Sequence, residues 1–301
     1  MKLNLKSNLL ILHLTVIVWG FTGILGALIT INETQLVWYR VLIAFVSLFI
    51  YFKWKKRDIK VSRNVFLKLF FTGAIVGLHW ILFFGAIKNS TVSVAMVCLS
   101  SLTLFTAILE PILNKTKISK LEVVVGLLII FGIYLIFKFE TQYKVGIIMG
   151  LTSALCASFF SIINAKQAKN RPATIISFYE LLGAFFWISI YLFIIEGFNS
   201  SMKLIPLDLI YLLILGTICT SVAYVAGVSV MKELSAFRVA LITNLEPVYA
   251  IILALIIFGK DEKMTNGFYI GAVIILGAIF LFPLVKKKIE IRKITKIPPL
   301  V

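Results

Sequence analysis

The sequence has 301 residues, of which 60% are hydrophobic and only 14% are charged. Soluble proteins carry roughly half apolar and about a quarter charged residues, so this composition excludes a soluble globular fold. The net charge of +17 could indicate nucleic-acid binding, but the charges fall in short loops and a tail beside apolar segments. Anionic membrane lipids are therefore the predicted partners of these charges, and no nucleic acid is expected.

Apolar runs of about 20 residues, the length that crosses the hydrocarbon core of a bilayer, recur along the whole chain. They predict an all-α integral membrane protein with ten transmembrane helices. In chain order, the expected spans are residues 8–30, 35–52, 65–87, 91–113, 121–137, 145–166, 174–195, 208–230, 235–258 and 268–285.

Positive charge is concentrated on one set of loops between these spans. Of the 30 Lys and Arg residues, 21 lie at the N-terminus, in alternate loops beginning with 53–64, or in the C-terminal tail, whereas six lie in the opposite loops. Because cytoplasmic loops retain Lys and Arg, both termini are predicted to face the cytoplasm from a bacterial inner (plasma) membrane. The tail residues expected to contact anionic headgroups are Lys286, Lys287, Lys288, Arg292, Lys293 and Lys296.

The second half of the chain repeats the first. Residues 122–137 read EVVVGLLIIFGIYLIF, and residues 267–282 read GFYIGAVIILGAIFLF. The alignment pairs Gly126 with Gly271 and Gly132 with Gly277, both 145 residues apart. Apolar helices can resemble one another through composition alone, but agreement of small residues in register favours a true internal repeat.

Each repeat contains five helices, and an odd number requires the second repeat to enter the membrane from the opposite side. The predicted units are residues 1–138, with helices one to five, and residues 139–301, with helices six to ten and the basic tail. Inverted repeats of this kind let a site at the membrane midplane open alternately to either side. The pattern therefore predicts a secondary transporter, and a membrane receptor or scaffold without transport activity is the alternative.

Enzymes and ATP-driven pumps are not favoured by the sequence. His13 and His79 are its only histidines and they are far apart, while Cys98, Cys156 and Cys219 show no metal-binding spacing. No phosphate-binding GxxxxGK[ST] loop occurs. We therefore expect no catalytic residues, no metal and no cofactor.

Four short motifs carry a family resemblance: Val-Trp-Gly-Phe at 18–21, Trp-Tyr-Arg at 38–40, Leu-Glu-Pro-Val-Tyr-Ala at 245–250 and Phe-Gly-Lys-Asp-Glu at 258–262. With the repeat, they make the chain resemble the drug/metabolite transporter superfamily, in particular EamA-type ten-helix transporters, over nearly its whole length. The resemblance implies two EamA repeats, cytoplasmic termini and export of small metabolites such as amino acids or drugs, either uncoupled or proton-linked. One departure lies in helix four, which lacks the usual proline near Thr103.

Four charged residues, Arg40, Glu180, Arg238 and Glu246, fall within the expected spans. A charge at the centre of a membrane helix costs about 2.5 to 3.5 kcal/mol on insertion scales, so these side chains need partners or water. Glu246 is deepest and precedes Pro247, which leaves one backbone carbonyl of the preceding turn unbonded. Arg238 lies eight residues earlier, on roughly the same helix face. Both a substrate site and structural ion pairs between helices agree with this pattern.

Four amphipathic side chains complete the predicted site as walls around these charges: Trp19, His79, Trp80 and Tyr224. A histidine bonded to a neighbouring helix is an equally simple interpretation of His79. The mixed charges predict a zwitterionic small-molecule substrate in a cavity surrounded by helices one to four and six to nine. Helices five and ten are expected at the periphery, where they contact lipid in a monomer or a second subunit in a homodimer.

Overall fold

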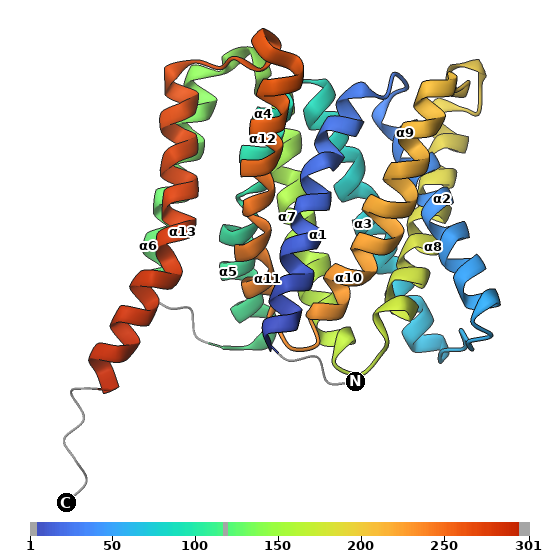
Figure 1. Cartoon of the computed structure of the whole chain (residues 1–301), viewed down its shortest axis with the longest axis horizontal. Helices are drawn as coiled ribbons and strands as arrows, with labels where there is room; N and C mark the ends of the chain where they lie inside the picture. The colour runs from blue at the N-terminus through green and yellow to red at the C-terminus, as the bar shows by residue number, and fades with distance from the viewer. Residues whose placement is uncertain (1–4, 117–119, 295–301) are drawn as a thin grey trace, which may run out of the picture.

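A computed structural model of the chain describes residues 5–116 and 120–294, and within these ranges it contains only helices and their connections (Figure 1). The helices form ten membrane segments, five in each half, which confirms the predicted fold class. The first five are α1 (Leu5–Leu28), α2 (Glu33–Trp54), α3 (Arg63–Lys88), the pair α4 (Val92–Leu99) and α5 (Leu102–Asn114), and α6 (Lys120–Phe139).

The second half follows the same order. Its segments are α7 (Lys144–Ala168), α8 (Ala173–Tyr191), the run α9 (Pro206–Gly216), η4 (Thr217–Val222) and α10 (Ala223–Val230), the pair α11 (Ala236–Thr243) and α12 (Leu245–Phe258), and α13 (Asn266–Ile294). Within the described residues, eight segments are long and apolar enough to cross a membrane, and shorter apolar helices occur at Val124–Phe139 and Asn266–Phe282. These two are the fifth and tenth segments.

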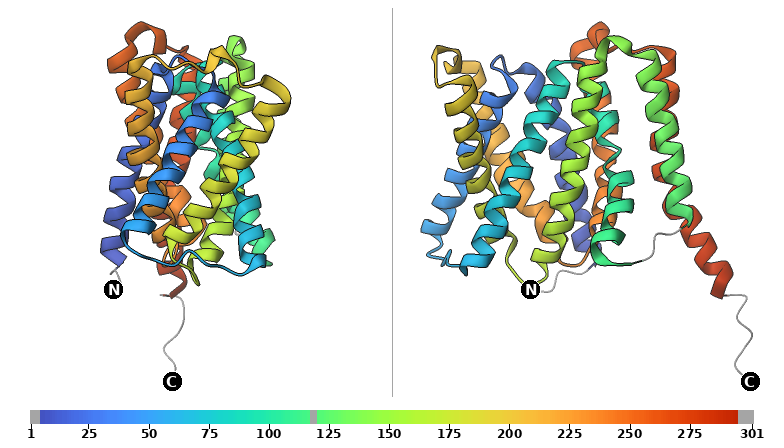
Figure 2. Two further views of the ribbon diagram at one scale, coloured as in Figure 1. Left: turned by 90° about the vertical axis from the view of Figure 1, so that its right-hand side faces the viewer. Right: turned by 180° about the vertical axis from the view of Figure 1, so that it is seen from behind.

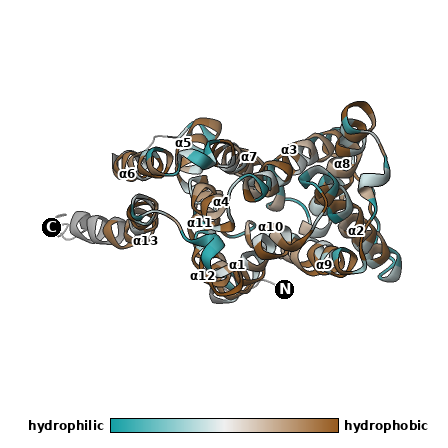
Figure 3. Cartoon of the chain, turned by 90° about the horizontal axis from the view of Figure 1, so that it is seen from above, coloured by the Kyte–Doolittle hydropathy of each residue, from teal (hydrophilic) through white to brown (hydrophobic). Residues whose placement is uncertain are grey.

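The segments run side by side, and α1 begins on the same side of the bundle on which α13 ends (Figures 1 and 2). We call this the inner side and the opposite face the outer side. Seen from above, the helices are mostly hydrophobic and polar residues gather in their connections (Figure 3). Large apolar side chains such as Phe193, Ile256 and Val273 are more than two-thirds exposed, as lipid contact requires.

The fourth and ninth segments are each broken near their middle, whereas the sequence predicted continuous helices there. In the ninth, the break falls at Asn244 because Pro247 lacks the N–H that would bond back to the preceding turn. In the fourth, the break falls at Ser100 and Ser101, whose hydroxyls bond to carbonyls of their own helix. The Asn244 amide donates to the Thr103 hydroxyl, so the two breaks are joined at the contact between the halves.

The fifth and tenth segments, α6 and α13, pack on each other at one end of the bundle, away from its centre (Figure 3). Their backbones cross at Gly132 and Gly271, where a methyl group on either glycine would come within 2.8 Å of the other's carbonyl oxygen. The repeat aligns Gly132 with Gly277, but the two helices are antiparallel, so Gly271 is the contact partner. The side chains of the basic tail, 286–296, lie outside the described residues, and their lipid binding stays a prediction.

Candidate functional site

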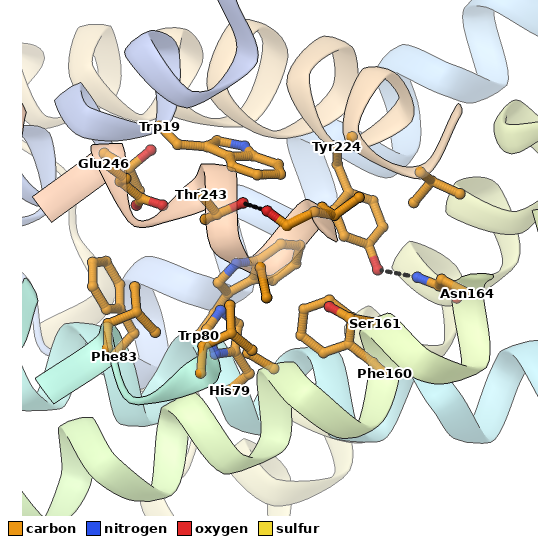
Figure 4. A pocket seen from close by; sticks show the side chains of 18 of the residues that line it. Trp19, His79, Trp80, Phe83, Phe160, Ser161, Asn164, Tyr224, Thr243 and Glu246 are labelled. Carbon is orange, nitrogen blue, oxygen red and sulfur yellow. Dashed lines mark hydrogen bonds between the residues drawn. The ribbon is translucent and has the colours of Figure 1, made fainter. Parts of the chain in front are cut away.

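A cavity of about 90 Å³ lies between the two halves, lined by residues from α1, α2, α3, both broken segments, α7, η4 and α10 (Figure 4). One water molecule needs roughly 10 to 15 Å³ by this measure, so the cavity has room for several waters or a small organic molecule. Neither α6 nor α13 contributes to its lining. Six of the eight predicted site residues do: Trp19, Arg40, His79, Trp80, Tyr224 and Glu246.

Arg40 supplies the cavity's positive charge. Its side chain is only 2% exposed, its Nε donates to the Thr220 hydroxyl at 2.6 Å, and its guanidinium carbon lies 4.3 Å from the centre of the Trp80 ring. Its Nη1 has no hydrogen-bond partner in the described part of the chain. A buried donor left unbonded costs about 1 to 3 kcal/mol, and more when charged, so Arg40 is prepared to bind an anionic group.

The backbone of the eighth segment positions the partner of Arg40. Thr220 lies in η4, a turn of π-helix between α9 and α10, and its hydroxyl also donates to the Leu215 carbonyl at 2.6 Å. A π-helical turn widens the helix by one residue and frees local backbone groups, and such turns are frequent at functional sites. Here it presents the Thr220 oxygen to Arg40.

Glu246 supplies the negative charge. It lies in the first turn of α12, immediately after the break, and is 6% exposed. Its carboxylate forms no hydrogen bond and no ion pair within 4 Å among the described residues, although it attracts Arg40 electrostatically. An isolated buried carboxylate is costly. A cationic ligand group in the cavity would compensate that charge.

Glu180 is fully buried on α8 behind the cavity wall, and the structure does not bring it to the lining. Its Oε2 accepts hydrogen bonds from the Tyr224 hydroxyl at 2.8 Å and from the Asn164 amide at 3.1 Å. Tyr224 and Asn164 both line the cavity, and the Asn164 amide also donates to the Tyr224 hydroxyl (Figure 4). Glu180 therefore reaches the cavity only through these two side chains.

Arg238 is exposed on the first half of the ninth segment and does not line the cavity. Its expected position rested on the eight-residue spacing to Glu246 along one continuous helix. The break at Asn244 lies between the two residues and changes the direction of the chain. The helical spacing therefore does not carry Arg238 to the face on which Glu246 lies.

Aromatic side chains form the walls between the two charges. Trp80 and Tyr224 meet edge to face with ring centres 5.6 Å apart, and Trp19 packs against Gly227 of α10. His79 lines the cavity but also bonds through Nδ1 to the Ser153 hydroxyl at 2.8 Å, as the structural interpretation predicted. The walls suit an apolar or aromatic group carried between two charged ends.

Sequence reasoning missed three polar residues that hold this arrangement: Ser153, Asn164 and Thr220. Each lies inside an apolar span and is fully buried. Polar residues at membrane depth were the available signal, because they need partners as charged residues do. The signal is weak for Ser and Thr, since their hydroxyls can bond to a carbonyl of their own helix.

The sequence profile of the EamA-like transporter family matches residues 6–138 and 144–283, one match in each half of the fold. This chain belongs to the EamA-like transporter family. It is accordingly a multi-pass membrane transporter with a small-molecule substrate, and not an enzyme.

Curated relatives are distant but cover much of the chain. The chain is 28% identical to "Uncharacterized transporter sll1164" of Synechocystis sp. over 67% of its own length and 60% of that protein's. It is 24% identical to an "Uncharacterized transporter" of Archaeoglobus fulgidus, over 93% of this chain and 98% of that one. A solved structure titled "Crystal structure of protein" aligns with a TM-score of 0.69 at 14% identity, over 93% of this chain and 98% of that one. At that identity the likeness shows the fold alone.

Proposed function

We propose that this EamA-family protein is a secondary transporter that exports small zwitterionic metabolites, such as amino acids, by alternating access. The observation that carries the proposal is the pair Arg40 and Glu246. They have opposite charges, they line one cavity between the two halves, and among the described residues neither forms an ion pair. Structural ion pairs, by contrast, bring the two charged groups into direct contact.

A zwitterion satisfies both charges at once. Its carboxylate would accept from the free Nη1 of Arg40, its ammonium group would approach Glu246, and its side chain would lie against Trp19 and Trp80. Taking a charged group out of water is costly unless it gains a partner of opposite sign. Two partners already held in a low-dielectric cavity reduce that cost for the substrate, and the substrate reduces it for them.

Two equivalent contacts, one on each face, suit the alternating opening of the cavity. On the outer side, the Glu262 carboxylate accepts from the Val92 and Ser93 backbone N–H groups at 2.8 and 2.9 Å, at the start of α4. On the inner side, Glu110 accepts from the Phe237 N–H at 2.9 Å, at the start of α11. Each carboxylate holds the first turn of the broken helix from the opposite half, so rocking of one half can release one contact while keeping the other.

The moving units in this proposal are residues 1–138 and 139–301, and the inner side is the cytoplasmic side. The concentration of Lys and Arg on the inner loops supports that orientation. Export follows from family resemblance and not from the cavity itself, which would serve either direction. A receptor of the same fold would bind the zwitterion without moving it.

The experiment is a comparison of metabolites in the medium of cells that overexpress the parent protein or one of two variants. Glu246→Gln keeps the side-chain shape and removes the cavity charge. Glu233→Gln makes the same chemical change at an exposed position and is the matched control. We expect the parent and Glu233→Gln to enrich the same zwitterions, and Glu246→Gln to enrich none. Equal enrichment by Glu246→Gln, inserted at the same level, would exclude Glu246 from the site.

A further inference from the structure

Glu180 is the most deeply buried acidic group of the central bundle, and its two carboxylate oxygens differ in their surroundings. Oε2 accepts both hydrogen bonds, from Tyr224 and Asn164, whereas Oε1 has no partner in the described part of the chain. The amide oxygen of Asn164 is also buried and unbonded. Two unbonded acceptors beside one carboxyl group lack a donor, and a proton on Glu180 would supply it.

We propose that Glu180 is the proton-binding site of this transporter, separate from the Arg40 and Glu246 pair, and that Tyr224 and Asn164 transmit its charge state to the substrate cavity. The inference rests on the proposed transport function for its purpose, but not for its test.

The surroundings of Glu180 provide no compensating cation. The elements that pack against α8 are α2, α3, α7, α10 and the short turn after α8. Inside the bundle, their titratable side chains are Tyr39 and Arg40 on α2, His79 on α3, Cys156 on α7 and Tyr224 on α10. Of these, only Tyr224 bonds to Glu180. Tyr39 donates to the Met202 carbonyl, Arg40 to Thr220, and His79 bonds to Ser153.

Among the described residues, no Lys, Arg or His lies within ion-pair distance of Glu180. Other titratable groups on those elements are exposed or lie near helix ends, as Lys68 and Lys166 do on the inner side. On α8 itself, Tyr179 donates to the Ile59 carbonyl. An ionised Glu180 would thus be a buried charge balanced by two neutral donors only, and such a group takes up a proton instead.

Proton binding changes the hydrogen bonds that the cavity wall can make. When Glu180 is ionised, Tyr224 and Asn164 both donate to it, as the structure shows. When Glu180 takes a proton from water, its new O–H becomes a donor. Rotation of the Asn164 amide then turns its unbonded oxygen toward that O–H and turns its NH₂ group toward the cavity. No other bond forms or breaks, so a single proton switches the wall between two hydrogen-bonding states.

Glu180 is also placed for access from one side. It lies seven residues after the start of α8 on the inner side, about 10 Å along the helix. Arg40 lies seven residues after the start of α2 on the outer side, at the equivalent position in the other half. The inverted repeat therefore places a fixed positive charge on one side of the cavity and a protonatable acid on the other.

The test uses infrared spectroscopy of the full-length protein in lipid and needs no substrate. The probe is the proton itself, because a protonated carboxyl group has a carbonyl stretching band that a carboxylate lacks. At neutral pH, we expect the parent spectrum minus the Glu180→Gln spectrum to contain this band, and the band to disappear at high pH. The Glu246→Gln variant should retain it. Absence of the band at neutral and mildly acidic pH, or its loss in Glu246→Gln alone, would overturn the assignment.

A second variant tests the link to the cavity. Tyr224→Phe keeps the ring and removes the hydroxyl that bonds to Glu180, so the band should remain but shift to higher frequency. An unchanged frequency would show that Tyr224 does not transmit the charge state. Exchange of sodium for choline at constant pH should leave the band unaltered, and a sodium-dependent band would identify a metal-cation site instead. Because these readouts do not involve transport, they remain informative if the substrate proposal fails.

Discussion

Replacement of Gly183 by alanine tests the closest contact between the halves, where α3 and α8 cross. A methyl group at Gly183 would lie 2.9 Å from the backbone carbonyl carbon of Phe70 and 3.0 Å from its Cα, whereas carbon atoms prefer about 3.5 to 4.0 Å. Backbone atoms cannot rotate away, so the two helices must separate. Overpacking costs up to about 3 kcal/mol, and alanine's better helix propensity returns about 1 kcal/mol.

The expected net destabilisation is therefore about 2 kcal/mol, or about 4 to 8 °C in the thermal midpoint of the purified protein. Tryptophan fluorescence during heating at a fixed scan rate measures it. Gly277→Ala is the matched control, because no atom lies within 4 Å of the added methyl group. That variant should be unchanged or slightly more stable. A Gly183→Ala midpoint equal to the control would mean that α3 and α8 do not pack this closely.

Two further predictions concern the outer contact and the topology. Glu262→Ala should lower the thermal midpoint, because two backbone N–H groups at the start of α4 lose a buried acceptor at about 1 to 3 kcal/mol. Hydrogen exchange should become faster in that turn, whereas the exposed neighbour Asp261→Ala should change neither quantity. A reporter fused after Val301 should report the cytoplasm and one in loop 196–207 the outside. A Val301 reporter found outside would contradict the charge-based orientation.

The helical segments could be predicted from the sequence because a membrane imposes a simple rule: apolar runs must be long enough to cross it. The inverted arrangement followed from an odd number of helices per repeat, and the family match agrees with both. The breaks in the fourth and ninth segments were harder. Pro247 indicated a weakened turn, but nothing in the apolar pattern showed that Ser100 and Ser101 would interrupt a helix of uniform hydropathy.

The candidate site was predicted in part for the same reason. Arg40 and Glu246 could be identified because charge inside a span is costly wherever it occurs. The placement of Arg238 depended on helical spacing across a break that the sequence did not reveal. Glu180 was found as a buried charge, but its separation from the cavity by Tyr224 and Asn164 depends on packing between three helices. No single-helix pattern contains that information.

The central claim is that Arg40 and Glu246 each bind one charge of a zwitterionic substrate. The most direct test is uptake into proteoliposomes of the zwitterion found in the medium, the amine that lacks its carboxylate, and the acid that lacks its amino group.

Loss of a hydrogen bond to a charged group costs about 1.5 to 3 kcal/mol, which is roughly a 10- to 100-fold loss of apparent affinity. We predict that Arg40→Gln imposes this loss on the zwitterion and the acid but not on the amine, and that Glu246→Gln imposes it on the zwitterion and the amine but not on the acid. Equal losses for all three compounds in both variants would show that these charges hold the fold together and do not bind substrate.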